Sequence, residues 1–249
     1  MFKTLILFLS LVNILEAKEL PKFLRNLRCP LTHNFKPCFL KNGNAAIPLL
    51  AEGDEEYNIP KMNPFEIPVA QLTTTPMLSL NLTNLKVYGL NEMKIVDAEV
   101  DLKRREFKTS IKSSNLTIVG ALDAEGRVII LPVKSKGFFS MSLINGTYNI
   151  TKIDHIIDKL GDKYYKPVFE PLQYTLGKIE FKIEKLFGEN VVLDEVMDKF
   201  LNENWELAMT EFGPKVAAFI TDIVTDIFNS LTDVVPVRNI FLDDPVFKF

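Results

Sequence analysis

The sequence contains few of the residues that most often carry catalysis or bind metals. Its 249 residues include two histidines, two cysteines and one tryptophan. The sequence contains no G-x-S-x-G, H-E-x-x-H or G-x-x-x-x-G-K-[ST] motif. It therefore lacks the usual motifs of serine hydrolases, zinc proteases and P-loop enzymes. We therefore predict that the protein is not an enzyme and has no catalytic residues, no cofactor and no metal site.

An excess of positive charge is also lacking. The 29 basic residues are outnumbered by 32 acidic ones, giving a net charge of −3, whereas nucleic-acid binding needs a basic patch. The most apolar stretch near the C-terminus is interrupted by Asp222 and Asp226, and a membrane span needs about 20 residues nearly free of charge. We predict no nucleic-acid partner and no stable membrane anchor.

The first 17 residues have the layout of a secretory signal peptide. Lys3 precedes an apolar run from Leu5 to Leu15, and the small residue Ala17 offers a cleavage point. Removing residues 1–17 leaves 232 residues without a linker or repeat, which fits one large domain over residues 18–249. The protein is predicted to be secreted and extracellular.

Glycosylation and disulfide signals agree with secretion. Cys29 and Cys38 are the only cysteines, and in an oxidising compartment they are predicted to form one disulfide. Such a bond closes a short loop and would contribute roughly 2.5 kcal/mol in the chain-entropy description. Four Asn-x-Thr sequons predict N-glycosylation at Asn81, Asn115, Asn145 and Asn149.

A long apolar helix is predicted from Phe200 to Asp243. Its apolar residues form a stripe too wide for a helix on the surface, so a concave partner must cover it. Gly213-Pro214 predicts a kink or break, because proline removes a backbone donor and clashes with the preceding turn. The main apolar row consists of Leu201, Trp205, Ala208, Phe212, Val216, Phe219, Ile223 and Ile227.

Between the cysteines and this helix, apolar residues alternate with polar ones. Gly177–Phe187 and Met93–Leu102 are predicted to be antiparallel strands with one wet face. Turns are predicted at Asp123–Gly126 and at Asn145-Gly146. The residues expected to point inward are Ile179, Phe181 and Ile183 in the first strand and Val96, Ala98, Val100 and Leu102 in the second.

Two further strands change the face that carries their apolar residues. Such a slip predicts a β-bulge, and bulges make a sheet curl. The sequon residues Asn81 and Asn115 are expected on the outer face, where a glycan has solvent. The apolar residues change from Leu78, Leu80 and Leu82 to Leu85 and Val87, and from Phe107 and Ile111 to Leu116 and Ile118.

These patterns predict an α+β fold in which a strongly curved antiparallel β-sheet wraps around a long C-terminal α-helix. A short helix from Lys18 to Arg28 is expected at one end of the sheet. His155 is expected in a surface turn of helix, and a metal site with Asp154 and Asp158 is set aside because it would need two further ligands.

One short motif is the most distinctive part of the chain: Phe200-Leu201-Asn202-Glu203-Asn204-Trp205, preceded by Leu186–Asn190 and followed by the long helix. With it, the sequence from about Leu20 to Leu242 resembles the takeout and juvenile-hormone-binding protein superfamily of insects. Phe187-Gly188-Glu189 departs from the Asn-Gly turn usual in that family. Supporting matches are the cysteine pair, Ile59-Pro60, Phe65–Pro68, and Gly126 leading to Leu131-Pro132.

The resemblance implies the tubular lipid-binding fold and a tunnel for a small, elongated hydrophobic ligand such as a terpenoid, fatty acid or quinone. It implies a carrier without catalysis. The alternatives are a membrane- or receptor-facing lipid-binding module and, less favoured, a secreted esterase. The residues predicted to line the tunnel are Phe138, Met141, Phe181, Trp205, Met209, Phe212, Val216, Phe219 and Ile223.

Overall fold

The computed structural model describes residues 17–74, 78–128, 131–159 and 161–244. The predicted signal peptide, residues 1–17, thus lies outside the described residues except for Ala17. In chain order the elements are α1 (Lys22–Arg25), α2 (Phe35–Ala51), the 3₁₀ turn η1 (Glu55–Tyr57), β1 (Phe65–Thr74), β2 (Leu78–Tyr88), the 3₁₀ turn η2 (Leu90–Glu92), β3 (Lys94–Asp101), β4 (Glu106–Val128), β5 (Leu131–Lys159), β6 (Asp162–Phe169), β7 (Gln173–Thr175), β8 (Lys178–Glu184), α3 (Val191–Glu203), α4 (Trp205–Thr232) and α5 (Val237–Ile240).

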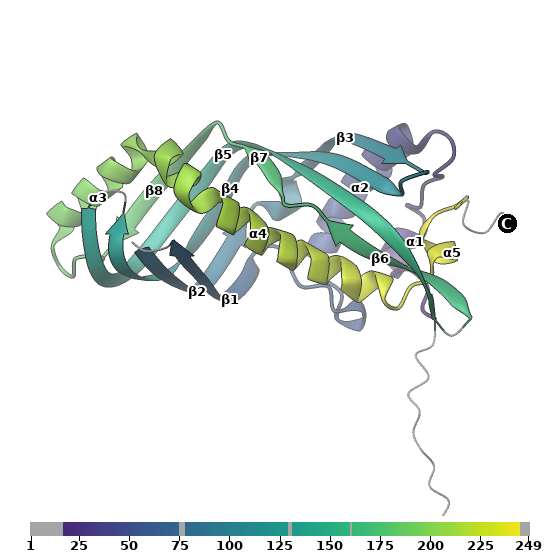
Figure 1. Ribbon diagram of the computed structural model, residues 1–249, viewed down its shortest axis with the longest axis horizontal. Coiled ribbons are helices and arrows are strands. Elements are labelled where there is room, and N and C mark those ends of the chain that lie inside the picture. Colours follow the sequence, from purple (N-terminus) through teal and green to yellow (C-terminus); the bar gives the residue numbers. More distant parts are fainter. Residues whose placement is uncertain (1–16, 75–77, 129–130, 160, 245–249) are drawn as a thin grey trace, which may run out of the picture.

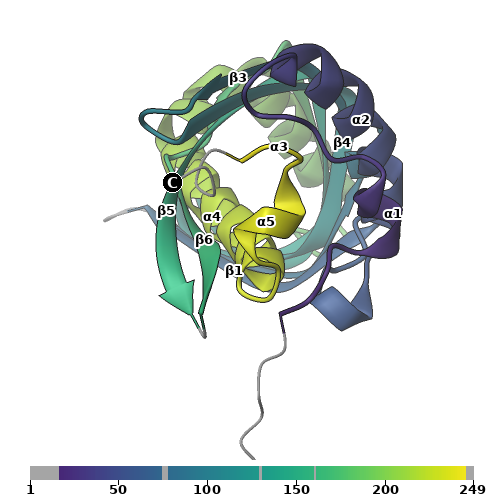
Figure 2. The same ribbon diagram turned by 90° about the vertical axis from the view of Figure 1, so that its right-hand side faces the viewer.

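The strands form one curled antiparallel sheet that confirms the predicted fold class. Its order is β1-β2-β4-β5-β6, with β3 paired to β4 and both β7 and β8 paired to β5. α4 runs along the sheet (Figure 1) and contacts β6 on one side and β1 on the other. Viewed end on, sheet and helix form a closed ring (Figure 2), so α4 joins the two edges of the sheet into a tube.

The two longest strands are β4 and β5, and β4 pairs from end to end with residues 131–153 of β5. The turn predicted at Asp123–Gly126 is therefore wrong, because these residues pair with residues 133–136. The turn predicted at Asn145-Gly146 is also wrong. Asn145 adopts a φ of 52°, the conformation that a turn would need, but it does so within β5.

Both predicted changes of face occur, but only one is a bulge. In β2 the register with β4 shifts between Thr83 and Lys86, as predicted, and turns Leu85 and Val87 inward. In β4 and β5 the pairing omits Ser114 and Asn145 and then resumes in the same register. The second bulge was thus wrongly predicted: both strands change face together, and even-numbered residues of β5 become the buried ones beyond this point.

The shorter strands follow their patterns with one exception. In β8, Ile179 and Ile183 are buried, as expected. In β3, Ala98 is buried, but Val96 is exposed because the register with β4 shifts between Ile95 and Asp97. Leu102 lies beyond the end of β3 and is exposed as well, so both inward predictions are corrected.

The predicted C-terminal helix is three helices. α3 ends before the Asn204 junction, α4 is continuous through Gly213-Pro214, and Pro236 precedes α5. The break expected at Pro214 is therefore absent from α4, where this exposed proline costs one hydrogen bond within a 28-residue helix. His155, expected in a turn of helix, instead lies in β5.

α3 fastens the edge strand β8 through three of its side chains. Carboxylate and amide oxygens of Asp194, Asp198 and Asn202 accept hydrogen bonds from backbone N–H groups of residues 185, 183 and 181. Four residues of a helix rise about 6.0 Å, and two residues of a strand rise about 6.6 Å. The spacing of the acceptor side chains along α3 therefore matches the spacing of the N–H groups along the strand. The edge strand is thereby covered without a further strand.

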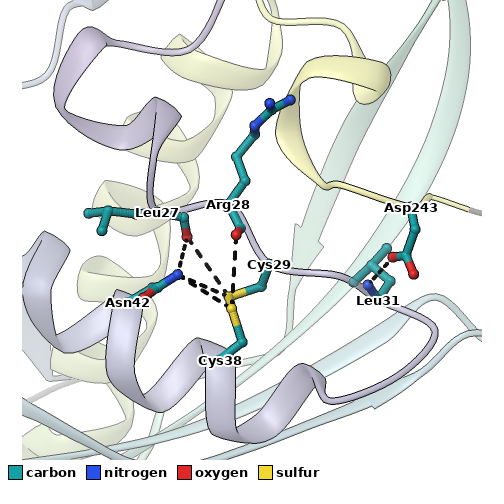
Figure 3. The surroundings of a disulfide bond; sticks show 7 residues. All are labelled: Leu27, Arg28, Cys29, Leu31, Cys38, Asn42 and Asp243. Atoms are coloured by element: carbon teal, nitrogen blue, oxygen red, sulfur yellow. Dashed lines mark hydrogen bonds between the residues drawn. A yellow bond between two sulfur atoms is a disulfide. The ribbon is translucent and has the colours of Figure 1, made fainter.

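The N-terminal region packs against the opposite end of the tube. The expected helix Lys18–Arg28 is reduced to α1, while α2 was not predicted. Cys29 and Cys38 form the predicted disulfide (Figure 3), which joins the segment before α2 to its first turn. The Asn42 amide donates to the Leu27 carbonyl oxygen at 3.2 Å and supports this junction. Among the described residues, no helix combines the length and apolar character needed to cross a bilayer.

Candidate functional site

The tube contains an apolar cavity of about 200 Å³, partly open to solvent, in the half that α3 covers. Its walls come from the concave face of the sheet, from the inner faces of α3 and α4, and from the segment that includes β7. Tyr148 and Tyr174 are the only lining residues with a polar group in the side chain. The lining comprises Leu80, Leu82, Ile118, Leu122, Ala124, Val133, Phe139, Met141, Leu143, Tyr148, Leu172, Tyr174, Leu176, Phe181, Ile183, Leu186, Met197, Leu201, Ala208, Met209, Phe212, Val216 and Ile220.

Five of the nine predicted lining residues face this cavity: Met141, Phe181, Met209, Phe212 and Val216. Trp205, Phe219 and Ile223 are partly buried but do not line the cavity. The cavity extends along α4 only from Ala208 to Ile220, so apolar residues near the ends of the helix pack elsewhere.

Phe138 is placed on the wrong face by the sequence analysis. Its side chain is 55% exposed and borders a groove on the outside of the sheet. Phe139 and Met141 both face the cavity, and inward residues of a regular strand are separated by two positions. Phe138 and Met141 are three positions apart, so they could not both have pointed inward without an irregularity between them.

Two tyrosines were missed by the sequence analysis. Tyr148 in β5 and Tyr174 in β7 are opposite each other in the paired strands, and both line the cavity. Tyr148 turns inward only because β4 and β5 change face at Ser114 and Asn145. The available signal was Asn145-Gly146, which marks a position of positive φ, but this signal predicts a turn as readily as a change of face.

Each tyrosine hydroxyl lies against a glycine. A Cβ atom at Gly146 would come within 2.4 Å of the Tyr148 hydroxyl, and one at Gly213 within 2.0 Å of the Tyr174 hydroxyl. Both distances are too short for any real side chain. The two glycines singled out in the sequence as turn and kink signals therefore make room for the polar groups of the cavity wall.

The Tyr148 hydroxyl is buried and has no hydrogen-bond partner among the described residues. Burial raises the pKa of Tyr148, and the nearby Ser113 hydroxyl opposes this shift without forming a hydrogen bond of normal geometry. The phenol therefore stays protonated at neutral pH. An unpaired buried hydroxyl costs about 1–3 kcal/mol, so this group lowers the stability of the folded chain.

The opposite end of the tube is filled with aromatic side chains. Phe241, which follows α5, stacks on Phe107 with ring centroids 5.8 Å apart and meets the edge of Tyr165 at 6.2 Å. Lys152 lies 4.3 Å from the centre of the Phe107 ring and forms an ion pair with the buried Asp154. The interior of the tube is thus hollow near α3 and closed near α5.

The residues considered for catalysis lie away from the cavity. His155 is exposed on β5, and neither it nor His33 is among the lining residues. Asp154 is buried beside Lys152, whereas Asp158 is exposed. No group of three potential metal-binding side chains occurs within the described part of the chain.

The predicted glycosylation sites lie on strands β2, β4 and β5. Asn115, Asn145 and Asn149 are exposed. Asn81 is only partly exposed, and its side-chain oxygen is buried without a hydrogen-bond partner in the described structure. Three of the four acceptor side chains are thus accessible from outside, and modification of all four stays a prediction.

Comparison with solved structures supports the tubular fold. The crystal structure of Takeout 1 from Epiphyas postvittana matches with a TM-score of 0.74 and 23% identity, over 86% of this chain and 99% of that one. A lipopolysaccharide binding protein matches with a TM-score of only 0.31 and 12% identity, over 69% of this chain and 37% of that one. Comparison with curated protein sequences gives no match.

The sequence profile of one family extends over nearly the whole chain. It is the family described as haemolymph juvenile hormone binding protein, and it matches residues 4–242. This range contains every wall of the cavity, from β2 to α4. The chain therefore belongs to the haemolymph juvenile hormone binding protein family.

Proposed function

We propose that this protein is a secreted carrier that binds one slender hydrophobic molecule in the cavity between α4 and the sheet and releases it unchanged. The observation that carries the proposal is the cavity itself, whose wall is apolar. Membership of a family named for binding a hydrophobic hormone supports it.

The energy of an empty cavity favours occupation. At roughly 24 cal/mol per Å³, a vacant apolar space of 200 Å³ costs about 5 kcal/mol. The total stability of a domain is typically about 5–15 kcal/mol, so this cost would be a large fraction of it. A ligand that fills the space would restore the missing contacts and stabilise the folded chain.

The wall also indicates what the ligand should look like. Ligand pockets usually measure about 300–1,000 Å³, so a cavity of 200 Å³ suits a narrow chain better than a broad ring system. A terpenoid, fatty-acid derivative or quinone with an unbranched or isoprenoid tail meets this condition.

Native mass spectrometry of the protein secreted from insect cells tests the proposal. We expect one small molecule per chain, recovered by organic extraction, with an apolar tail and an oxygen acceptor. The delipidated protein should gain thermal stability with palmitic acid, farnesol or a short-chain ubiquinone. An empty protein that none of these compounds stabilises would contradict the proposal.

A further inference from the structure

The start of α3 carries a cluster of exposed aliphatic side chains. Val191, Val192, Leu193 and Val196, here called the apolar tip, are between 43% and 67% exposed. α3 lies at the end of the molecule opposite α1 and α5 (Figure 1). Single exposed apolar residues are common on proteins, but four within six residues at one end form a patch that needs an explanation.

The exposure of the apolar tip is fixed by the other face of α3. Asp194 is buried and accepts hydrogen bonds from the backbone N–H groups of Lys185 and Phe187. Met197 and Leu201, one and two turns further on, are buried in the core. α3 cannot turn the tip inward without breaking these bonds and exposing Met197.

The apolar tip is also adjacent to the cavity. Met197 and Leu201 line the cavity, and Val196 is the neighbour of Met197 in the chain. One helix therefore presents apolar side chains to the cavity on one face and to the outside on the other. A ligand at this end of the cavity is separated from the external surface by the thickness of α3.

The size and charge of the patch indicate its partner. Four aliphatic side chains present at most a few hundred Å², whereas a stable protein interface buries about 800 Å² on each partner. The exposed charged residues between positions 185 and 199 are Lys185, Glu189, Glu195 and Lys199. Their two positive and two negative charges cancel. A balanced rim suits headgroups that carry both charges, and gives no basic patch for anionic lipids.

We propose that the apolar tip inserts into the headgroup region of a zwitterionic phospholipid surface. Aliphatic side chains on a helix at such a surface reach about 5–10 Å into the boundary between headgroups and acyl chains. The contact is reversible, because only the first turns of α3 take part. It goes beyond ligand carriage and would hold the α3 end of the cavity at the surface from which apolar molecules are exchanged.

Flotation of the delipidated protein with phosphatidylcholine vesicles tests this inference. The variant V192D/V196D should lower the partition coefficient at least tenfold. Both positions are exposed, and Asp near a helix N-terminus is compatible with the helix dipole, so α3 should stay folded. The control V69D/V168D adds the same charge at valines that are 53% and 50% exposed on β1 and β6, and should float like the unmodified protein.

Three outcomes would overturn the inference: failure of the unmodified protein to float, an equal loss for both double variants, or a dimer in sedimentation velocity that V192D/V196D dissociates. The last would make the tip an interface between copies of the chain. Vesicle binding is measured without any cavity ligand, so these results are independent of the carrier proposal.

Discussion

At the scale of single residues, Tyr148 places an unpaired polar group behind the apolar cavity wall. Its side chain lines the cavity, but its hydroxyl is buried against Gly146 and has no partner among the described residues. A group of this kind lowers the stability of the folded protein. Its contribution can be measured by removing the hydroxyl alone.

Tyr148→Phe should make the delipidated protein at least as stable as the unmodified protein, and up to about 1–3 kcal/mol more stable, because an unpaired buried hydroxyl is removed. Affinity for farnesal and for the matching hydrocarbon should change little, because the ring still lines the cavity. Urea unfolding and isothermal titration give the two values. A clear loss of stability in the variant would show that the hydroxyl is paired in the folded protein.

Residue positions were predictable from the sequence where the strand alternation is unbroken. The alternation of Gly177–Phe187 predicted that Phe181 points inward, and Phe181 lies in the cavity wall. Lys152 and Asp154 point into the tube because β5 changes face at Asn145. An alternation of apolar and polar residues does not predict a charged pair in the interior. The residue at which a strand changes face depends on its pairing with the neighbouring strand. The sequence of one strand alone does not show that pairing.

At the scale of elements, three side chains of α3 fasten β8 beside the cavity. Asp194, Asp198 and Asn202 repeat every four residues and meet backbone N–H groups that repeat every two. The strand β8 was predictable from its alternation of isoleucine and phenylalanine with charged residues. Its fastening to a helix was not, because polar side chains on a helix are ordinarily taken to face solvent.

Asp198→Ala should lower the free energy of unfolding by about 1–3 kcal/mol, because the Ile183 N–H is left without its acceptor. Glu195→Ala, which changes an exposed acid on the same helix, should cost less than about 0.5 kcal/mol. Urea unfolding followed by circular dichroism gives both values. Equal stability of the two variants would show that the side-chain ladder does not hold β8.

A helix could be predicted from the sequence where its apolar residues form a clear stripe. The wide apolar stripe of α4 gave the long helix, although Pro214 does not break it. α2 contains Pro37, Gly43 and Pro48 and was missed. It forms because the disulfide and the aromatic contact of Phe35 with Phe107 hold it against the sheet, and such tertiary support is invisible to propensity.

At the scale of the whole molecule, the segment before α2 and the segment after α5 meet at the filled end of the tube. The Asp243 carboxylate accepts hydrogen bonds from the backbone N–H groups of Leu31 and Thr32 and from the Thr32 hydroxyl (Figure 3 shows the Leu31 contact). His33 lies 3.4 Å from the same carboxylate. This contact and the Phe241 stack close the end opposite the cavity.

The stabilisation from Asp243 should be lost in acid. Burial raises the pKa of this carboxyl, but the hydrogen bonds from Thr32 and Leu31 outweigh burial, so its pKa lies below the ordinary value near 4. A lowered pKa in the folded state gives stability that is present above the unfolded-state pKa and disappears as pH falls through the folded one. The difference in melting temperature between the unmodified protein and Asp243→Asn should therefore shrink below about pH 4. A difference that stays constant from pH 6 to pH 2 would contradict this assignment.

The hollow half of the tube is the central feature of the account, and filling it tests the account most directly. Met209→Trp introduces a large ring into the cavity, whereas Leu207→Trp adds the same ring on the exposed side of α4. Val216→Phe fills the cavity from two turns further along and guards against a folding defect specific to position 209. The measurement is fluorescence titration of delipidated protein with the polyene fatty acid cis-parinaric acid. The account predicts at least a tenfold loss of affinity for both cavity variants and none for Leu207→Trp, and unchanged binding in folded cavity variants would contradict it.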